Sequence, residues 1–174
     1  MQFGDGKYTT KQEPRQGFNK KPKMSAYTQI LYQLIFATKN KGKIMIPDGQ
    51  ESLYRYISGV MKHKKCHLYR INGTEDHIHI ITHIHPTVAL AHLIKDIKLS
   101  SSIFIKQENL FPGFNGWQDK YGAFTYSYAA KDNLIEYVKN QKEHHKTVSF
   151  REEFINLIKE HGVAFDEKFF FGEN

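Results

Sequence analysis

The order in which strand-type and helix-type hydrophobic periodicities follow one another is the feature that most constrains this fold. Apolar side chains alternate with other residues in some segments and recur at helical spacing in others. Read in order, the segments run strand, helix, strand, strand, helix, strand, and then further helices. This order predicts a ferredoxin-like α+β domain, with an antiparallel sheet, helices on one face and additional C-terminal helices. The predicted strands are residues 27–38, 66–71, 75–85 and 121–129, and the predicted helices are 47–62, 87–106, 131–145 and 149–161.

Three regions differ in composition. Residues 1–24 are rich in Lys, Gln and Gly and lack periodicity, which predicts a flexible basic leader. Residues 25–161 contain no internal repeat or boundary, so we expect one domain. Residues 162–174 form a Phe-rich tail, and so many aromatic side chains are expected to dock on this subunit or on a partner.

Composition excludes several classes of protein. No apolar run approaches the roughly 18 residues that a membrane-spanning helix needs. The N-terminus lacks the apolar middle segment of a secretory signal, and a lone cysteine, Cys66, rules out an internal disulfide. We therefore expect a cytoplasmic protein in a reducing compartment.

The charge of the chain favours a polyanionic partner. The net charge is +7, but residues 1–24 carry six Lys or Arg residues against two acidic ones. The predicted domain is therefore only mildly basic, and the leader itself could contact nucleic acid.

His77 and His79 lie in the alternating run Asp76-His77-Ile78-His79-Ile80. Residues two apart on a strand share a face, so both imidazoles point to one side of the sheet and both isoleucines to the other. Neutral imidazole is a ligand for several divalent ions. Two strand histidines facing solvent are the alternative interpretation.

His83 and His85 have the same parity but lie farther along the strand. Six residues separate His77 from His83, which corresponds to about 20 Å. The second pair therefore cannot bind the same ion, and we expect exposed side chains or phosphate contacts there.

Tyr137 and Gln141 are four residues apart on the helix predicted for residues 131–145, so they lie one above the other. Alone, each would be an ordinary residue at the edge of the apolar stripe. A tyrosine that attacks a phosphodiester needs a cation beside the phosphate, and a glutamine one turn away could help to hold it. Two imidazoles and an amide oxygen suit Mg²⁺ or Mn²⁺, with Mn²⁺ matching the nitrogen ligands better.

With these motifs in this order, the sequence resembles the HUH-type single-tyrosine transposases of small bacterial insertion sequences. The resemblance runs from residue 27 to about residue 145. It rests on Asp76-His77-Ile78-His79, on the stretch from Trp117 to Ser127, and on Tyr137-Val-Lys-Asn-Gln141.

The resemblance implies a function and a site. Tyr137 would be the catalytic nucleophile, cutting single-stranded DNA at hairpin-marked ends and leaving a 5′-phosphotyrosine link and a free 3′-hydroxyl. His77, His79 and Gln141 would hold Mg²⁺ or Mn²⁺. Members of this family form homodimers that can share active sites between subunits.

Basic side chains outside the leader form two groups that could bind DNA phosphates. Ordinary solvated lysines are an equally good interpretation. The groups are Lys39, Lys41 and Lys43 in one turn, and Lys64, Lys65 and Arg70 around the second strand.

Other functions stay open. A domesticated relative could cut repeat hairpins without mobilising an element. A non-catalytic nucleic-acid-binding module of ferredoxin-like fold and a structural or metal-storing homodimer are the remaining classes. The central strands lack the aromatic signature of sheets that bind RNA, which disfavours the binding module.

Overall fold

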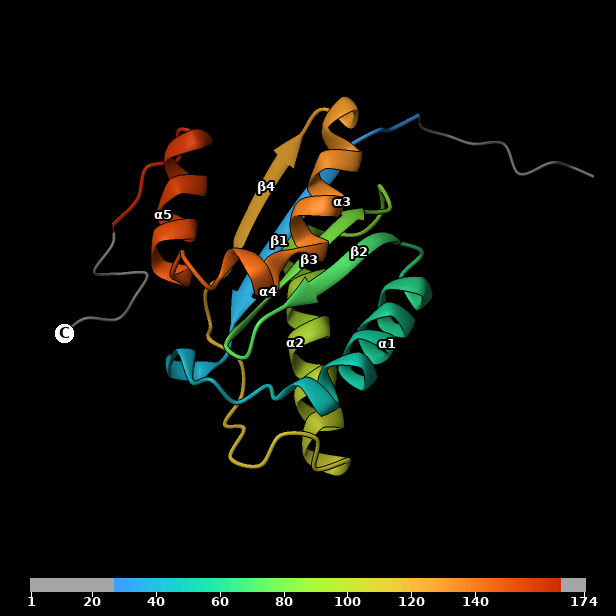
Figure 1. Ribbon diagram of the computed structural model, residues 1–174. Coiled ribbons are helices and arrows are strands. Elements are labelled where there is room, and N and C mark those ends of the chain that lie inside the picture. Colours follow the sequence, from blue (N-terminus) through green and yellow to red (C-terminus); the bar gives the residue numbers. More distant parts are fainter. Residues whose placement is uncertain (1–26, 167–174) are drawn as a thin grey trace, which may run out of the picture.

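The computed structural model describes residues 27–166 (Figure 1). The leader predicted for residues 1–24 and the aromatic residues 169–171 lie outside this range. Four strands, five α-helices and two short 3₁₀ helices make up the described part. The strands are β1 (Leu31–Ala37), β2 (His67–Gly73), β3 (His77–His83) and β4 (Gly122–Tyr126); the helices are η1 (Lys39–Lys41), α1 (Pro47–His63), α2 (Leu90–Gln107), η2 (Tyr128–Ala130), α3 (Lys131–Lys139), α4 (Gln141–His144) and α5 (Phe150–Glu160).

The strands form one sheet in the order β2-β3-β1-β4, and each neighbouring pair is antiparallel. This topology confirms the predicted ferredoxin-like α+β class. In the register of the two central strands, His79 lies opposite Ile35 and His77 lies opposite Ala37. Both histidines are therefore at the centre of the sheet, where helices cover them.

Helices cover both faces of the sheet (Figure 1). On one face, α1 and α2 pack on the inward side chains of β1 and β3, among them Leu34, Ile78 and Ile80. On the other face, α3 packs on Leu31 and Ile81, while α5 packs on Ile35 and the β4 strand. The second face is the one that carries His77 and His79.

The strand predicted for residues 66–71 extends two residues farther at its C-terminal end, to Gly73. Asn72-Gly73 is a common turn pair, yet both residues are the last positions of β2, and the connection is residues 74–76. Gly73 is needed because a Cβ there would lie 2.1 Å from the His77 carbonyl oxygen. The Asn72 side chain donates to the carbonyls of Val138 and Lys139, at 3.1 and 2.9 Å, and so ties β2 to the end of α3.

The continuous helix predicted for residues 131–145 is wrong. The backbone at Asn140 leaves helical geometry, with φ −93° and ψ 15°, so α3 ends at Lys139 and α4 begins at Gln141. The two carbonyls that accept hydrogen bonds from Asn72 lie next to this break, at the end of α3. Tyr137 and Gln141 thus belong to two helices.

The remaining boundaries lie close to those predicted. The α5 helix starts at Ser149, whose hydroxyl accepts from the Glu152 amide while the Glu152 carboxylate accepts from the Ser149 amide. Phe165, from the predicted tail, packs against the α5 core at Phe154. Within residues 27–166, no helix combines the length and apolar character needed to cross a membrane.

Candidate functional site

His77 and His79 are both fully buried on the face of the sheet that α3 and α5 cover. Ile78 and Ile80, between and after them, belong to the opposite core beneath α1 and α2. The two imidazoles lie side by side, with ring centroids 5.0 Å apart. The alternative of two solvent-facing histidines therefore does not describe this strand.

The Nδ1 atom of each imidazole has polar partners. The Nδ1 of His77 donates to the Asp76 carboxylate at 2.6 Å, and the Thr74 hydroxyl donates to the same oxygen at 2.7 Å. The Nδ1 of His79 lies 3.0 Å from the Gln33 side-chain amide, whose oxygen accepts from the Tyr126 hydroxyl at 2.7 Å. Such partners orient an imidazole and direct its Nε2 toward a ligand.

Tyr137 and Gln141 reach the same pocket despite the helix break. The Tyr137 ring lies 6.2 Å from that of His79 between centroids. Gln141 is fully buried and opens α4. A single chain thus brings together all four residues predicted for the site.

Glu153, on α5, occupies the centre of this cluster and was missed by the sequence reasoning. Its Oε1 accepts hydrogen bonds from the Tyr137 hydroxyl and from the Gln141 amide, the latter at 3.0 Å. Its Oε2 faces the histidines of β3. The sequence does carry a signal, because Glu153 falls inside the apolar stripe formed by Phe150, Phe154 and Leu157.

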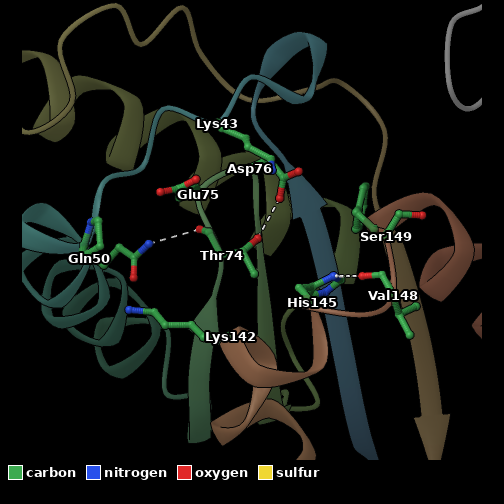
Figure 2. Close-up of a pocket in the computed structure, with 11 residues that line it drawn as sticks. Lys43, Gln50, Thr74, Glu75, Asp76, Lys142, His145, Val148 and Ser149 are labelled. Carbon is green, nitrogen blue, oxygen red and sulfur yellow. Dashed lines mark hydrogen bonds between the residues drawn. The ribbon is translucent and has the colours of Figure 1, made fainter.

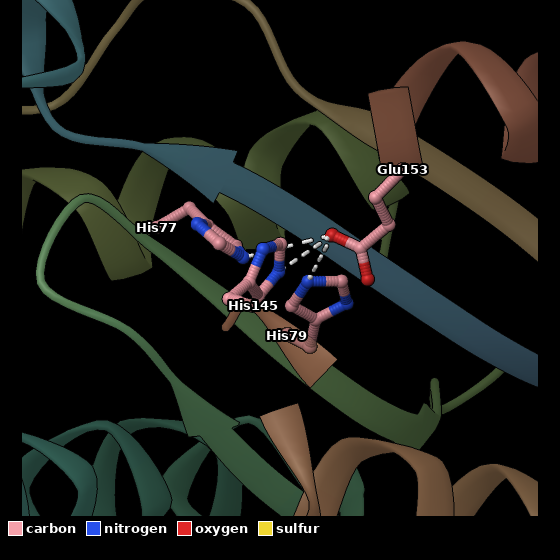
Figure 3. A group of neighbouring side chains, drawn as sticks. All are labelled: His77, His79, His145 and Glu153. Carbon is pink, nitrogen blue, oxygen red and sulfur yellow. Dashed lines mark hydrogen bonds and ion pairs between the residues drawn. The ribbon is translucent and has the colours of Figure 1, made fainter. Parts of the chain in front are cut away.

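His145 is the second residue that the sequence reasoning missed. Its Nδ1 donates to the Val148 carbonyl at 2.7 Å, and its Nε2 lies 3.1 Å from the Glu153 Oε2. The same carboxylate oxygen lies 3.3 Å from His79 Nε2 and 3.7 Å from His77 Nε2. Figure 3 shows the three imidazoles converging on this oxygen.

Burial and neighbouring charges lower the pKa values of His77 and Glu153 and raise that of Tyr137. Burial lowers the pKa of His77 to about 4, against the raising effect of Asp76. Burial would raise the pKa of Glu153, but the His79 charge and hydrogen bonds from its neighbours hold it well below its usual range. Burial and the Glu153 charge raise the pKa of Tyr137. At neutral pH the site therefore holds a carboxylate, a neutral His77 and a protonated phenol.

Several buried polar atoms at this point have no hydrogen-bond partner. They are the Nε2 atoms of His77 and His79, the Oε1 of Gln141 and the Nε2 of His144. Leaving such atoms unpaired is costly, and natural proteins rarely do so without a reason. A divalent cation fits the first three, because imidazole nitrogens and amide oxygens donate electron pairs to metals. One potential ligand atom from each of His77, His79, His145 and Glu153 lies within 4.8 Å of the others.

A cavity of about 330 Å³ opens beside His145 and Asp76 (Figure 2). Thr74 and Gln50 line one side, where the Gln50 amide donates to the Thr74 carbonyl. Two lysines, Lys43 and Lys142, also line this cavity. The cavity next to the cluster therefore has a mixed lining, in which the two lysines are accompanied by the carboxylates of Glu75 and Asp76.

The other basic residues predicted to bind DNA lie in different places. Lys39 and Lys41 belong to η1, and Lys64 is paired with Asp96 between α1 and α2, under the opposite face of the sheet. Lys65 is exposed and Arg70 is partly buried. Among these six residues, only Lys43 lines the cavity at the cluster.

The second histidine pair lies away from the cluster, at the far end of β3. His83 Nδ1 accepts from the Ile30 backbone amide at 3.4 Å. His85 Nδ1 accepts from the Thr87 hydroxyl at 2.8 Å. These local contacts account for both rings.

Comparison with solved structures identifies the class of fold. One neighbour is a crystal structure of a protein assigned as a transposase from Deinococcus radiodurans R1, with 21% identity and a TM-score of 0.50 over 66% of this chain and 93% of that chain. Another is a REP-associated tyrosine transposase bound to a REP hairpin, with 14% identity and a TM-score of 0.54 over 72% of this chain and 76% of that chain. The fold is thus that of tyrosine transposases.

The family follows from the sequence itself. The model of the family described as IS200-like transposases matches residues 26–141. The chain therefore belongs to the IS200-like transposase family, and the resemblance stated above is confirmed. No curated protein matches the sequence. The family match ends at Gln141, so His145 and Glu153 lie beyond it.

Proposed function

We propose that this transposase cuts and rejoins single-stranded DNA through a covalent link to Tyr137. One observation carries the proposal: the Tyr137 hydroxyl, the unpaired Nε2 atoms of His77 and His79 and the unpaired Oε1 of Gln141 lie around one carboxylate. A nucleophile beside a set of unused metal ligands is the arrangement that phosphoryl transfer needs.

Each residue has a defined part. The Tyr137 oxygen attacks the phosphorus of a phosphodiester, the bond to the 3′ oxygen breaks, and that oxygen takes up a proton from solvent to leave as a 3′-hydroxyl. The Tyr137 proton moves toward the Glu153 oxygen with which it already shares a hydrogen bond. His77, His79 and Gln141 would hold Mg²⁺ or Mn²⁺. When bound, such an ion polarises the phosphate and offsets the charge that develops on it.

Rejoining is the reverse reaction with another 3′-hydroxyl as nucleophile. The phosphotyrosine conserves the energy of the broken bond, so no ATP is required. In this proposal the cavity beside His145 would hold the DNA backbone, with Lys43 and Lys142 contacting phosphates. Lys39 and Lys41 on η1, and the group of Lys64, Lys65 and Arg70, would contact DNA outside this cavity.

The substrate we propose is a DNA hairpin flanked by single strands. We propose that the protein acts on it as a homodimer in the cytoplasm. A second candidate is a repeat-hairpin endonuclease that mobilises no element. It is favoured by the likeness in fold to a REP-associated tyrosine transposase bound to a REP hairpin. Both candidates use the same first chemical step.

A covalent-trapping assay tests this step. The substrate is a pool of single-stranded oligonucleotides, each with a stem-loop flanked by randomised segments, supplied with Mn²⁺ or Mg²⁺. We expect an SDS-resistant adduct that keeps a label at the 3′ end of the DNA and loses a label at the 5′ end. Tyr137→Phe should form none, whereas Tyr128→Phe, which changes an exposed tyrosine outside the cluster, should match wild type.

Two results would contradict the proposal. An adduct that survives in Tyr137→Phe would assign the nucleophile to another residue. Binding of the hairpin pool without any adduct, in either metal, would favour the non-catalytic nucleic-acid-binding module.

A further inference from the structure

Glu153 and His145 do more than surround the predicted metal ligands. Both lie beyond the segment matched by the family model, yet the elements that follow Gln141 deliver them to the centre of the pocket. Two interpretations of the position of Glu153 are possible. Glu153 either blocks the site and must leave when a metal enters, or it is itself a ligand.

The spacing of the atoms favours a ligand. Glu153 Oε2 lies 3.1, 3.3 and 3.7 Å from the Nε2 atoms of His145, His79 and His77. Neighbouring ligands of a four-coordinate ion with bonds of about 2.0–2.2 Å are roughly 3.3 Å apart. The Glu153 oxygen is therefore about one ligand-to-ligand distance from each of the three imidazole nitrogens.

The packing of α5 also opposes a movable plug. Glu153 lies on the inward face of the helix between Phe150 and Phe154, both buried in the core that includes Ile35 and Phe124. The capping box at Ser149 fixes the start of the same helix. The helix that carries the carboxylate is therefore held firmly against the sheet.

The charge of the cluster leads to the same conclusion. A buried carboxylate is costly unless it is paired with a positive charge or a metal. The groups that face it are the imidazoles of β3, His144 and His145, the Tyr137 hydroxyl and the Gln141 amide. These groups neutralise the carboxylate only where an imidazole holds a proton, and a bound metal ion would take over that role.

The geometry points to a metal centre in which His145 and Glu153 are ligands beside His77, His79 and Gln141, and which therefore prefers a transition-metal ion to Mg²⁺. Three imidazoles and one carboxylate suit Mn²⁺, Co²⁺ or Zn²⁺, whereas Mg²⁺ favours oxygen ligands and retained waters. The inference rests on the proposed function because it assigns further ligands to the same metal. It also makes Glu153 the link between that metal and Tyr137, since its second oxygen accepts from the Tyr137 hydroxyl.

Calorimetric titration of the full chain with Mn²⁺, Co²⁺ and Mg²⁺, without DNA, tests the inference. Wild type should bind Mn²⁺ and Co²⁺ at least about tenfold more tightly than Mg²⁺. Glu153→Gln keeps the size of the side chain and should weaken Mn²⁺ binding by about tenfold or more. Glu152→Gln makes the same change one residue earlier, at an exposed position where glutamine still completes the capping box, and should bind as wild type does.

A second variant and a spectroscopic signal keep the test decisive if Glu153→Gln does not fold. Electron spin-echo modulation of bound Mn²⁺ should report three imidazole nitrogens in wild type and two in His145→Gln. Unchanged or tighter Mn²⁺ binding by Glu153→Gln would overturn the inference and identify Glu153 as a plug. Two imidazoles in wild type, or a preference for Mg²⁺, would overturn it as well.

The outcome is separable from that of the trapping assay. Metal binding that depends on Glu153, with no DNA adduct, would support this centre and contradict the proposed reaction. A DNA adduct together with an Mn²⁺ affinity that does not change in Glu153→Gln would support the proposed reaction and contradict this metal centre.

Discussion

The Tyr137 hydroxyl donates a hydrogen bond to the carboxylate of Glu153, and the two residues come from helices on either side of α4. The other oxygen of that carboxylate faces the β3 histidines. Tyr137 is therefore held beside the imidazole cluster by a side chain rather than by its own helix alone. The helix break at Asn140 is compatible with the site because α5 provides this connection.

The bond between β2 and the end of α3 should be needed for both stability and activity. Asn72→Ala removes two hydrogen bonds to the Val138 and Lys139 carbonyls, each contributing about 0.5–1.5 kcal/mol. We expect the free energy of unfolding to fall by about 1–2 kcal/mol and the yield of adduct to fall with it. Denaturant unfolding measures the first quantity. Asn133→Ala, at an exposed position of α3, should change neither, and an Asn72→Ala protein as stable as wild type would contradict this role.

Gln33 should control the affinity for metal without contacting it. Its side-chain amide lies 3.0 Å from the Nδ1 of His79 and is itself held by the Tyr126 hydroxyl. Gln33→Leu removes the partner that orients the ring, which typically weakens metal binding about 10–100-fold. Tyr126→Phe leaves the contact to His79 in place and should have a smaller effect. Calorimetric titration with Mn²⁺ gives both values, and equal affinities for Gln33→Leu and wild type would rule out this role.

Mn²⁺ binding should weaken as the pH falls toward 6. The metal competes with a proton for the Nε2 of His145, and hydrogen bonding to Glu153 raises the pKa of that ring despite its burial. His77 contributes little over this range, because burial holds its pKa at about 4. Between about pH 8 and 6, each displaced proton lowers the apparent affinity by up to about tenfold per pH unit. His145→Gln should flatten this dependence, and an equally steep profile in that variant would contradict the assignment.

The active site should work within one subunit even if the protein is a homodimer. All the proposed groups meet in a single chain, with Tyr137 6.2 Å from His79 between ring centroids. A mixture of Tyr137→Phe and His77→Ala proteins should therefore form no adduct. Restored activity in the mixture would show that subunits exchange the tyrosine helix.

Local patterns explain which parts of the structure were predictable. Alternation and helical spacing located the strands and helices because burial on a single face leaves a mark in neighbouring residues. The same alternation placed His77 and His79 on one face of the sheet. Helical spacing and the family resemblance pointed together to Tyr137 and Gln141, and the roles of all four residues are proposals.

The missed features depend on contacts between distant segments. Gly73 follows Asn72 as in a turn, yet it is required for the close approach of the His77 carbonyl. The break at Asn140 is supported by the Asn72 side chain, 68 positions away in the chain. Glu153 could have been noticed as a charge in an apolar stripe, but only the packing of α5 on the sheet reveals what it faces.

Peptide mapping of the trapped adduct tests the central claim most directly. Trypsin should release residues 132–139, Asp-Asn-Leu-Ile-Glu-Tyr-Val-Lys, in which Tyr137 is the lone side-chain hydroxyl. After nuclease digestion of the attached DNA, mass spectrometry should find this peptide carrying a nucleotide through a 5′ phosphate. A nucleotide on any other peptide, or attachment through a 3′ phosphate, would contradict the account.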